Sequence, residues 1–232
     1  MVRVAELISS ALKWLAASGY GVSLMTDSQT NVAGVLAVMA NETELDGLNV
    51  PCVCLGSEAR EYSCVTFDAV DYTYSVTKSL YEAGYKQVLL VHHGAKKDAP
   101  QELNGFFCAR LELALDSRAE AVVNAKDIEE KLPRLLKKAR PCGLILTDTA
   151  DYSMVCRVLR LCGLKLDEVQ VVVCACNGER RYLSPAPICY EYPAERMAQA
   201  AVSMLEEAIQ LGHYALPDKR SVPGKFINRK IM

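Results

Sequence analysis

The chain has 232 residues, of which 51% are hydrophobic, and its 26 basic residues nearly balance its 28 acidic ones. This size allows one large domain or two lobes with a substantial core, and no run of like charges favours binding of nucleic acid by bulk charge. No apolar run is long enough for a transmembrane helix and no signal-peptide pattern opens the chain, so we expect a soluble, cytoplasmic protein without a membrane partner.

The N-terminal part of the chain predicts an unusual start for an α/β fold. Residues 3–18 have the apolar stripe of an amphipathic helix, and Gly19 ends it. Strands are expected at 20–25 and 32–39, which only a short loop separates. Parallel neighbours need a longer crossover, so either these strands pair as a hairpin or a helix is absent between them. No strand precedes the first helix, and both gaps indicate an incomplete or eroded N-terminal portion.

A strand, a helix and a second strand are predicted within residues 65–94. Residues 65–68 form a short strand, Asp71 is placed to cap the helix, and Gly84 ends it. Residues 87–91 are almost wholly apolar, which is typical of a strand covered by helices on both faces. The pattern therefore predicts a parallel βαβ unit, which binds small molecules at the carboxyl ends of its strands.

Polar residues follow both strands of this unit. Asp68 and Asp71 come after the first strand, and His92 and His93 after the second. Because neighbouring side chains of a strand point to opposite faces, at most one of the two histidines faces a site. The alternative is a purely structural role, in which Asp71 caps the helix and the histidines pack without contacting a ligand.

The rest of the chain alternates strands with helices of ten to fifteen residues. A helix begins near Pro100, and later helices cover a charged stretch containing Pro133, an apolar stretch closed by Gly163, and residues 193–210. Strands are expected at 121–123, 143–147, 169–176 and, at a sheet edge, 222–228. This order predicts a doubly wound α/β structure with parallel sheets.

The chain has ten cysteines, and those that the pattern places are distributed as buried free thiols are. They alternate within apolar strands (Cys52, Cys54, Cys174, Cys176) or lie on predicted helices (Cys108, Cys156, Cys162). Neither a disulfide framework nor a zinc-binding spacing is present. We therefore expect no metal and no other cofactor.

Four spans together resemble a known family. They are SCVTFDAVDYTYSVTKSLYEAGYKQVLLV, LNGFFCARLELAL, GLILTDTADYSMVCRVLRLCGLKLDEVQVVV and PDKRSVPGKFINRK. Their order and spacing resemble the effector-binding domain of the lactose-repressor (LacI/GalR) family of bacterial transcription regulators, from about Val32 onward. The resemblance implies a periplasmic-binding-protein-like fold of type I, in which two α/β lobes joined by three hinge crossings clamp a small ligand.

The resemblance also implies the division of the chain into lobes. Residues 1–84 with 190–220 would form the N-terminal lobe, and residues 85–189 with 221–232 the C-terminal lobe. The crossings would lie near Gly84, Cys189 and Ser221. Only Met1 and Val2 precede the first helix, so operator DNA would be bound only through a helix-turn-helix domain that this chain lacks.

Carried over residue by residue, the family's ligand site matches this chain only in part. Asp71 and Asp148 fall at polar positions of the family's site. Glu102 replaces an arginine that grips sugar hydroxyls in many members, and Asn177 follows the strand where an aspartate is usual. The expected ligand-binding residues are Asp68, Asp71, Glu102, Asn124, Asp148 and Asn177. Four of them are carboxylates, so we expect a cationic or donor-rich effector rather than a standard sugar or a sugar phosphate.

Three functions follow from these patterns. The first is a small-molecule effector-binding and dimerisation domain of a regulator, working as a homodimer through the apolar first helix and Trp14. The second is a dimerisation scaffold that has lost its ligand, or a solute-binding protein of the same fold. An enzyme is not expected, because no GxSxG, GxGxxG, GxxxxGK[ST] or HExxH motif occurs. One enzymatic alternative is that a pair such as Cys174 and His93 acts as nucleophile and base.

Overall fold

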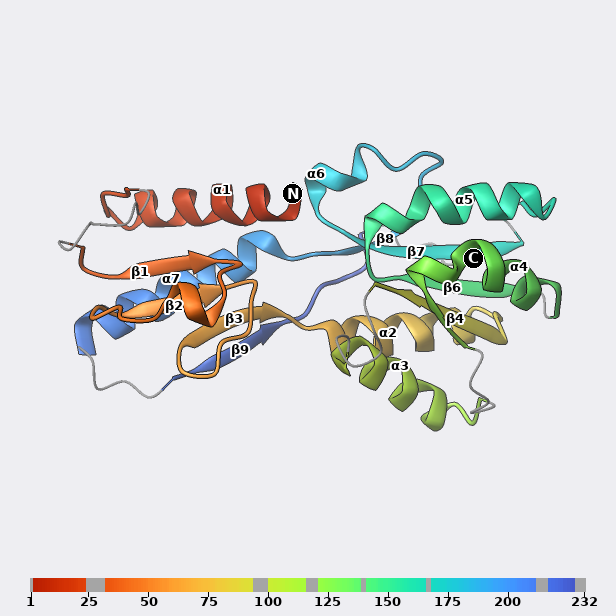
Figure 1. The fold of residues 1–232 in the computed structure, drawn as a ribbon, viewed down its shortest axis with the longest axis horizontal. Coiled ribbons are helices and arrows are strands. Elements are labelled where there is room, and N and C mark those ends of the chain that lie inside the picture. The colour runs from red at the N-terminus through yellow and green to blue at the C-terminus, as the bar shows by residue number, and fades with distance from the viewer. Residues whose placement is uncertain are drawn as a thin grey trace. The chain divides into compact units, whose positions relative to one another are not determined.

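The computed structural model describes residues 2–23, 32–93, 100–115, 121–138, 141–165, 168–211 and 217–227. The contacts divide the chain into two compact units (Figure 1). The first unit comprises residues 1–67 and 193–222, and the second comprises residues 68–192 and 223–232.

The first unit is built on a sheet of four parallel strands. Its strand order is β1-β2-β3-β9. The elements are α1 (Val2–Ala17), β1 (Val35–Val38), a 3₁₀ helix (Glu42–Glu44), β2 (Cys52–Leu55), β3 (Ser63–Phe67), α7 (Ala194–Leu211) and β9 (Lys219–Val222). Helix α7 packs on β2 and β3, and α1 packs on α7. The fully buried Val53, Leu55 and Val65 form the centre of this core.

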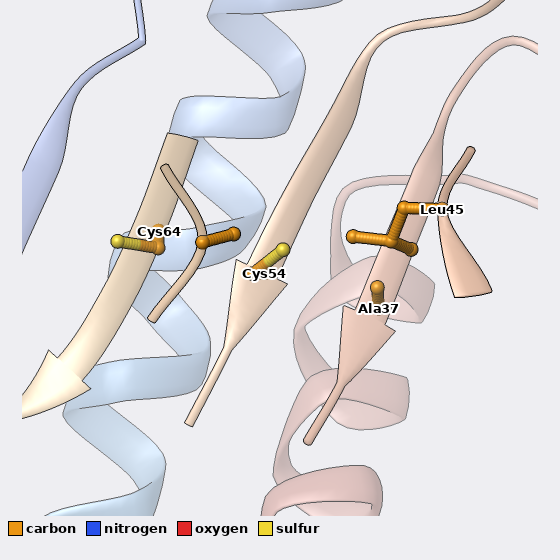
Figure 2. Close-up of a cluster of buried hydrophobic side chains, with 5 residues drawn as sticks. Ala37, Leu45, Cys54 and Cys64 are labelled. Carbon is orange, nitrogen blue, oxygen red and sulfur yellow. The ribbon is translucent and has the colours of Figure 1, made fainter. Parts of the chain in front are cut away.

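The sheet of the first unit has a smaller apolar cluster. Ala37, Cys54 and Cys64 are register partners on neighbouring strands, so their side chains share a face of the sheet. Leu45 and Ala59 join them in the cluster, and Figure 2 shows Leu45 beside Ala37. A short segment rather than a long helix therefore contributes to the covering of this face.

The second unit is built on a sheet of five parallel strands in the order β5-β4-β6-β7-β8. Its strands are β4 (Gln87–His92), β5 (Val122–Asn124), β6 (Cys142–Leu146), β7 (Val169–Ala175) and β8 (Ile188–Glu191). Its helices are α2 (Ala69–Glu82), α3 (Pro100–Glu112), α4 (Ile128–Lys138), α5 (Tyr152–Leu161) and α6 (Asn177–Arg180), with 3₁₀ helices Ala125–Asp127 and Thr149–Asp151. The parallel α/β fold predicted from the alternation of strands and helices is confirmed.

Apolar composition explains why β6 and β7 lie in the middle of this sheet. Every residue of β6 is buried, as are all residues of β7 except Gln170. Helix α4 runs through Pro133 without a break. The helix α2 ends in front of Gly84, which has a φ of +98° that favours glycine.

The sequence prediction fails near both ends of the chain. Residues 20–23 form no strand, and residues 24 and 25 lie outside the described part. Strand β1 pairs in parallel with β2, and no strand among the described residues pairs with its other edge, so the hairpin considered above is not seen there. The C-terminal strand is β9, which ends before Pro223 instead of beginning at Val222, because Pro223 offers no N–H to a ladder. Asn228 lies outside the described residues.

The first boundary between the units also differs from the expected crossing near Gly84. The chain leaves the first unit after Phe67, so α2 belongs to the second unit. The reason is packing, because α2 contacts α3, β4, β6 and β7. The other boundaries follow Tyr192 and Val222.

All ten cysteines are free thiols, and burial raises the pKa of Cys142 to about 12. Among the described residues, no three histidine, cysteine or acidic side chains are grouped as metal ligands would be. No helix within the described ranges has the length and apolar character needed to cross a membrane.

Candidate functional site

The carboxyl edge of the second sheet gathers most of the predicted site residues. Asn124 ends β5, and Asp148 and Asn177 follow β6 and β7. In a parallel sheet these ends lie on one side, so the strand order places the three residues along a single edge. The N-terminus of α2 lies at the same edge, because the Tyr72 hydroxyl donates a hydrogen bond of 2.8 Å to the Leu146 carbonyl at the end of β6.

Asp68, rather than Asp71, caps helix α2. The Asp71 N–H donates to Asp68 Oδ1 over 2.8 Å. The prediction that Asp71 is the cap is therefore wrong, because β3 ends at Phe67 and the first non-helical residue is Asp68. This leaves the Asp71 carboxylate available for other contacts.

The Asp71 carboxylate lies at the centre of a hydrogen-bonded cluster. Ser75 Oγ donates to its Oδ1 over 3.1 Å, and the Tyr190 hydroxyl donates to its Oδ2 over 2.6 Å. Burial raises the pKa of Tyr190, and its hydrogen bond to Asp71 raises it further, so the phenol stays protonated. Tyr190 also lies 5.0 Å from the Tyr72 ring and 5.3 Å from the Phe226 ring.

An open groove of about 1140 Å³ lies beside this cluster. It is bounded by α2 and by the segment 223–226, and Asp71 is the one predicted site residue among those that line it. The lining also includes Tyr190, Ser75, Lys78 and Glu82. The Tyr190 hydroxyl has already donated its hydrogen to Asp71, so at this point it offers the groove only an acceptor oxygen, beside the charged acceptor Asp71.

The remaining predicted residues have local structural contacts as well. Asn124 Oδ1 accepts from the Lys126 N–H, and Asp148 Oδ1 accepts from the Ala150 N–H, each at the start of a 3₁₀ helix. Asn177 opens α6 and is exposed. Glu102 lies in the first turn of α3, where its carbonyl accepts from Thr73 Oγ1 over 2.8 Å. Of the predicted site residues, Asp68 and Asp71 are therefore hydrogen-bonded to each other. Glu102 lies where α3 is hydrogen-bonded to α2.

Sequence reasoning missed an ion pair at this edge. His93 Nε2 lies 3.0 Å from Asp151 Oδ1. Asp151 is only 6% exposed, and its Oδ2 is buried with no hydrogen-bond partner among the described residues. His92 is buried at the end of β4, and His93, just past the strand, is exposed. The spacing Asp148-x-x-Asp151 after a buried strand was the available signal, but no sequence rule connects it with His93.

Burial raises the pKa of Asp151, while the nearby His93 opposes this shift. Asp148 adds to the rise, and His92 opposes it. Because the folded pKa lies above the unfolded one, ionisation of Asp151 destabilises the folded state at neutral pH, and this cost disappears as the pH falls below the unfolded value. A buried acid with a shifted pKa is also a common feature of functional sites.

We therefore expect Asp151→Asn to increase the free energy of unfolding by about 1 kcal/mol at pH 8, because a neutral amide avoids the cost of keeping an ionised carboxylate buried. The increase should shrink as the pH falls toward 4. Urea unfolding at several pH values measures both effects, with Glu130→Gln, at an exposed carboxylate of α4, as the control. A variant that is less stable than the parent at pH 8 would show that the pair with His93 outweighs the cost of burial.

The arrangement at this edge suits recognition of a polar molecule. Carboxylates accept hydrogen bonds and attract cations, and the Tyr190 phenol supplies an aromatic ring with an engaged hydroxyl. Burial raises the pKa of Cys189 against the effect of Arg180, which disfavours its thiolate. The described edge thus offers hydrogen-bond acceptors, negative charge and an aromatic ring.

Solved structures of bacterial regulators share this fold over almost the whole chain. A transcription regulator from Lactobacillus plantarum matches with a TM-score of 0.82 at 15% identity, covering 98% of this chain and 95% of that one. The transcription regulator CcpA of Lactococcus lactis matches with a TM-score of 0.78 at 15% identity, covering 98% and 93%.

A third structure of the same fold contains a ligand. It is the periplasmic binding protein/LacI transcriptional regulator from Alkaliphilus metalliredigens QYMF, complexed with D-xylulofuranose. Its TM-score is 0.72 at 16% identity, and the match covers 97% of this chain and 92% of that one. No curated protein sequence matches the chain significantly. The model of the periplasmic binding protein-like domain matches residues 77–230, about two thirds of the sequence, and the chain therefore belongs to this family.

Proposed function

We propose that the chain is the small-molecule effector-binding and dimerisation domain of a bacterial transcription regulator. The observation that carries this proposal is the match of nearly the whole fold to several transcription regulators. One structural neighbour holds a small sugar, which supports a ligand role for the fold. Operator DNA would be contacted through a separate helix-turn-helix domain.

The proposed ligand contacts lie at the carboxyl edge of the second sheet. They are the predicted residues Asp68, Asp71, Glu102, Asn124, Asp148 and Asn177, to which the structure adds Tyr190. The hydrogen bond between Tyr190 and Asp71 supports this choice, because it holds a charged acceptor in one orientation beside an open groove.

A broad metabolite screen by thermal unfolding tests the proposal. A ligand present at a hundred times its Kd should stabilise the folded chain by about 2.7 kcal/mol, which raises the Tm by several degrees. Hits should lose their effect in Asp71→Ala but keep it in Glu130→Gln, which alters an exposed carboxylate on α4. A flat response across the library would contradict an effector role.

A specific observation favours a second candidate, the scaffold without a ligand. Asp68, Asn124 and Asp148 each use a side-chain oxygen to accept from a backbone N–H at the start of a helix. Side chains with such a local role stabilise the fold whether or not a ligand binds. A flat screen together with a stable dimer would support this alternative.

We also propose a homodimer that uses helix α1. Light scattering at tens of micromolar should give twice the mass of the chain, since isologous pairing is the commonest oligomeric arrangement. Trp14 lies half-buried on α1, and large aromatic side chains dominate most interfaces. Trp14→Gln should therefore raise the dimer Kd about tenfold, while Tyr182→Gln, at an exposed residue of the second unit, should not. A monomer mass for the parent chain would contradict the proposal.

A further inference from the structure

An apolar cavity of about 820 Å³ lies in the first unit, beside the free edge of its sheet. All four residues of β1, Val35–Val38, line this cavity, which we call the edge groove. Strand β1 is the terminal strand of the sheet, and among the described residues no strand pairs with its outer edge. The edge groove is thus an opening at the end of a parallel sheet.

The main chain of β1 offers unused hydrogen-bonding groups to this groove. The Val35 N–H donates to the Pro51 carbonyl over 2.8 Å, and the Met39 N–H donates to the Leu55 carbonyl over 2.9 Å. These residues therefore face β2. Because alternate residues of a strand direct their backbone groups to opposite sides, Leu36 and Val38 direct theirs away from β2 and into the groove.

The walls of the groove come from the layers on both faces of the sheet. Ile8, Leu12 and Leu205 line it from α1 and α7, on the helical side. Leu45 and Leu48 line it from the opposite side, where Leu45 belongs to the cluster with Ala37 (Figure 2). Apolar side chains from both faces of the sheet therefore line the groove beside β1. A strand placed there would have both faces covered, which requires aliphatic side chains.

The charged residues that line the groove are both acidic. Glu44 accepts from the backbone N–H of Asn41 over 2.9 Å. Glu206 on α7 is half-buried, and no cation pairs with it among the described residues. A basic side chain entering the groove would compensate the Glu206 carboxylate, whereas an acidic one would be repelled.

We propose that the edge groove binds an extended aliphatic peptide segment that carries one lysine or arginine, and that the segment adds to the sheet as a strand beside β1. Strand addition of this kind combines main-chain hydrogen bonds with side-chain pockets. It satisfies the outward groups of Leu36 and Val38, which a hydrocarbon ligand cannot do. The site is separate from the carboxyl edge of the second sheet and goes beyond the proposed effector function.

Fluorescence polarisation with the whole chain tests this proposal. The probe is a labelled, acetylated peptide of valines around one central lysine. Leu36→Pro removes an outward N–H without removing a bond between β1 and β2, so it should weaken binding about tenfold, while Leu36→Ala, which keeps the N–H, should weaken it less. Circular dichroism and thermal unfolding establish that each variant is folded.

Two matched changes separate charge from strand pairing. Glu206→Gln should weaken binding of the lysine peptide several-fold and leave a norleucine version unaffected. A peptide N-methylated at alternate residues should not bind, because its backbone cannot pair. Equal binding of the methylated peptide, displacement of the probe by decanoate with no effect of Leu36→Pro, or no binding of any peptide to the folded parent would each overturn the proposal.

Discussion

Replacing Gly105 by alanine should destabilise the second unit by about 3 kcal/mol, because no space exists for a side chain where α3 crosses α2. A Cβ atom at Gly105 would lie 2.1 Å from the Val70 carbonyl oxygen and 2.4 Å from Thr73 Oγ1. The first contact is with backbone, which cannot rotate away. The two helices would have to separate, with loss of the hydrogen bond from Thr73 Oγ1 to the Glu102 carbonyl.

Urea unfolding followed by circular dichroism measures this effect. Asn104→Ala is the matched control, since its neighbouring side chain on α3 is exposed. Gly143→Ala should have an intermediate effect, because a Cβ there would meet only the Leu80 side chain, at 2.9 Å for the nearest atom, and this side chain can shift. If Gly105→Ala is no less stable than Asn104→Ala, the close packing of α2 on α3 described above is wrong.

The second sheet was predictable because its strands carry unambiguous patterns. The apolar runs at β4, β6 and β7 are too long and too branched for loops, and Gly84 and Gly163 mark the ends of the helices between them. Parallel pairing then follows from the alternation with helices. Each prediction of this kind depends on neighbouring residues, so local sequence is sufficient.

The predictions failed where the decision depends on contacts between distant residues. Asp68 and Asp71 are both good caps, and only the end of β3 at Phe67 decides between them. Residues 20–23 have strand composition, yet a strand also requires a partner, which composition cannot supply. The ion pair of His93 with Asp151 joins the ends of two elements, so the local sequence of neither segment predicts this contact.

For the six predicted site residues, too, local features could be predicted and contacts between distant residues could not. Their positions after strands could be predicted, and the strand order then places Asn124, Asp148 and Asn177 along one edge. Tyr190 is different, because its hydrogen bond to Asp71 depends on β8 lying at the end of the sheet. The structure shows the hydroxyl of this tyrosine bound to a carboxylate.

An effector bound at this edge should be an amine or guanidinium compound, with affinity at least about tenfold above that of a matched neutral sugar or sugar phosphate. Asp68, Asp71, Glu102 and Asp148 are acidic, and Asp151 adds a further carboxylate. Such groups accept hydrogen bonds and repel one another unless a cation compensates them, so a cationic ligand relieves this repulsion whereas a phosphate increases it.

Calorimetric titration with matched amine, neutral-sugar and sugar-phosphate panels measures this preference. Asp71→Asn should weaken binding of an amine about ten- to a hundredfold, since it removes a charge that Ser75 and Tyr190 hold in place. Glu130→Gln should change nothing, because that exposed carboxylate lies on α4 and pairs with Arg134. Raising the salt concentration should weaken the amine more than a neutral ligand. Tight binding of a sugar phosphate that survives Glu102→Ala would show that the acidic edge is not where the ligand binds.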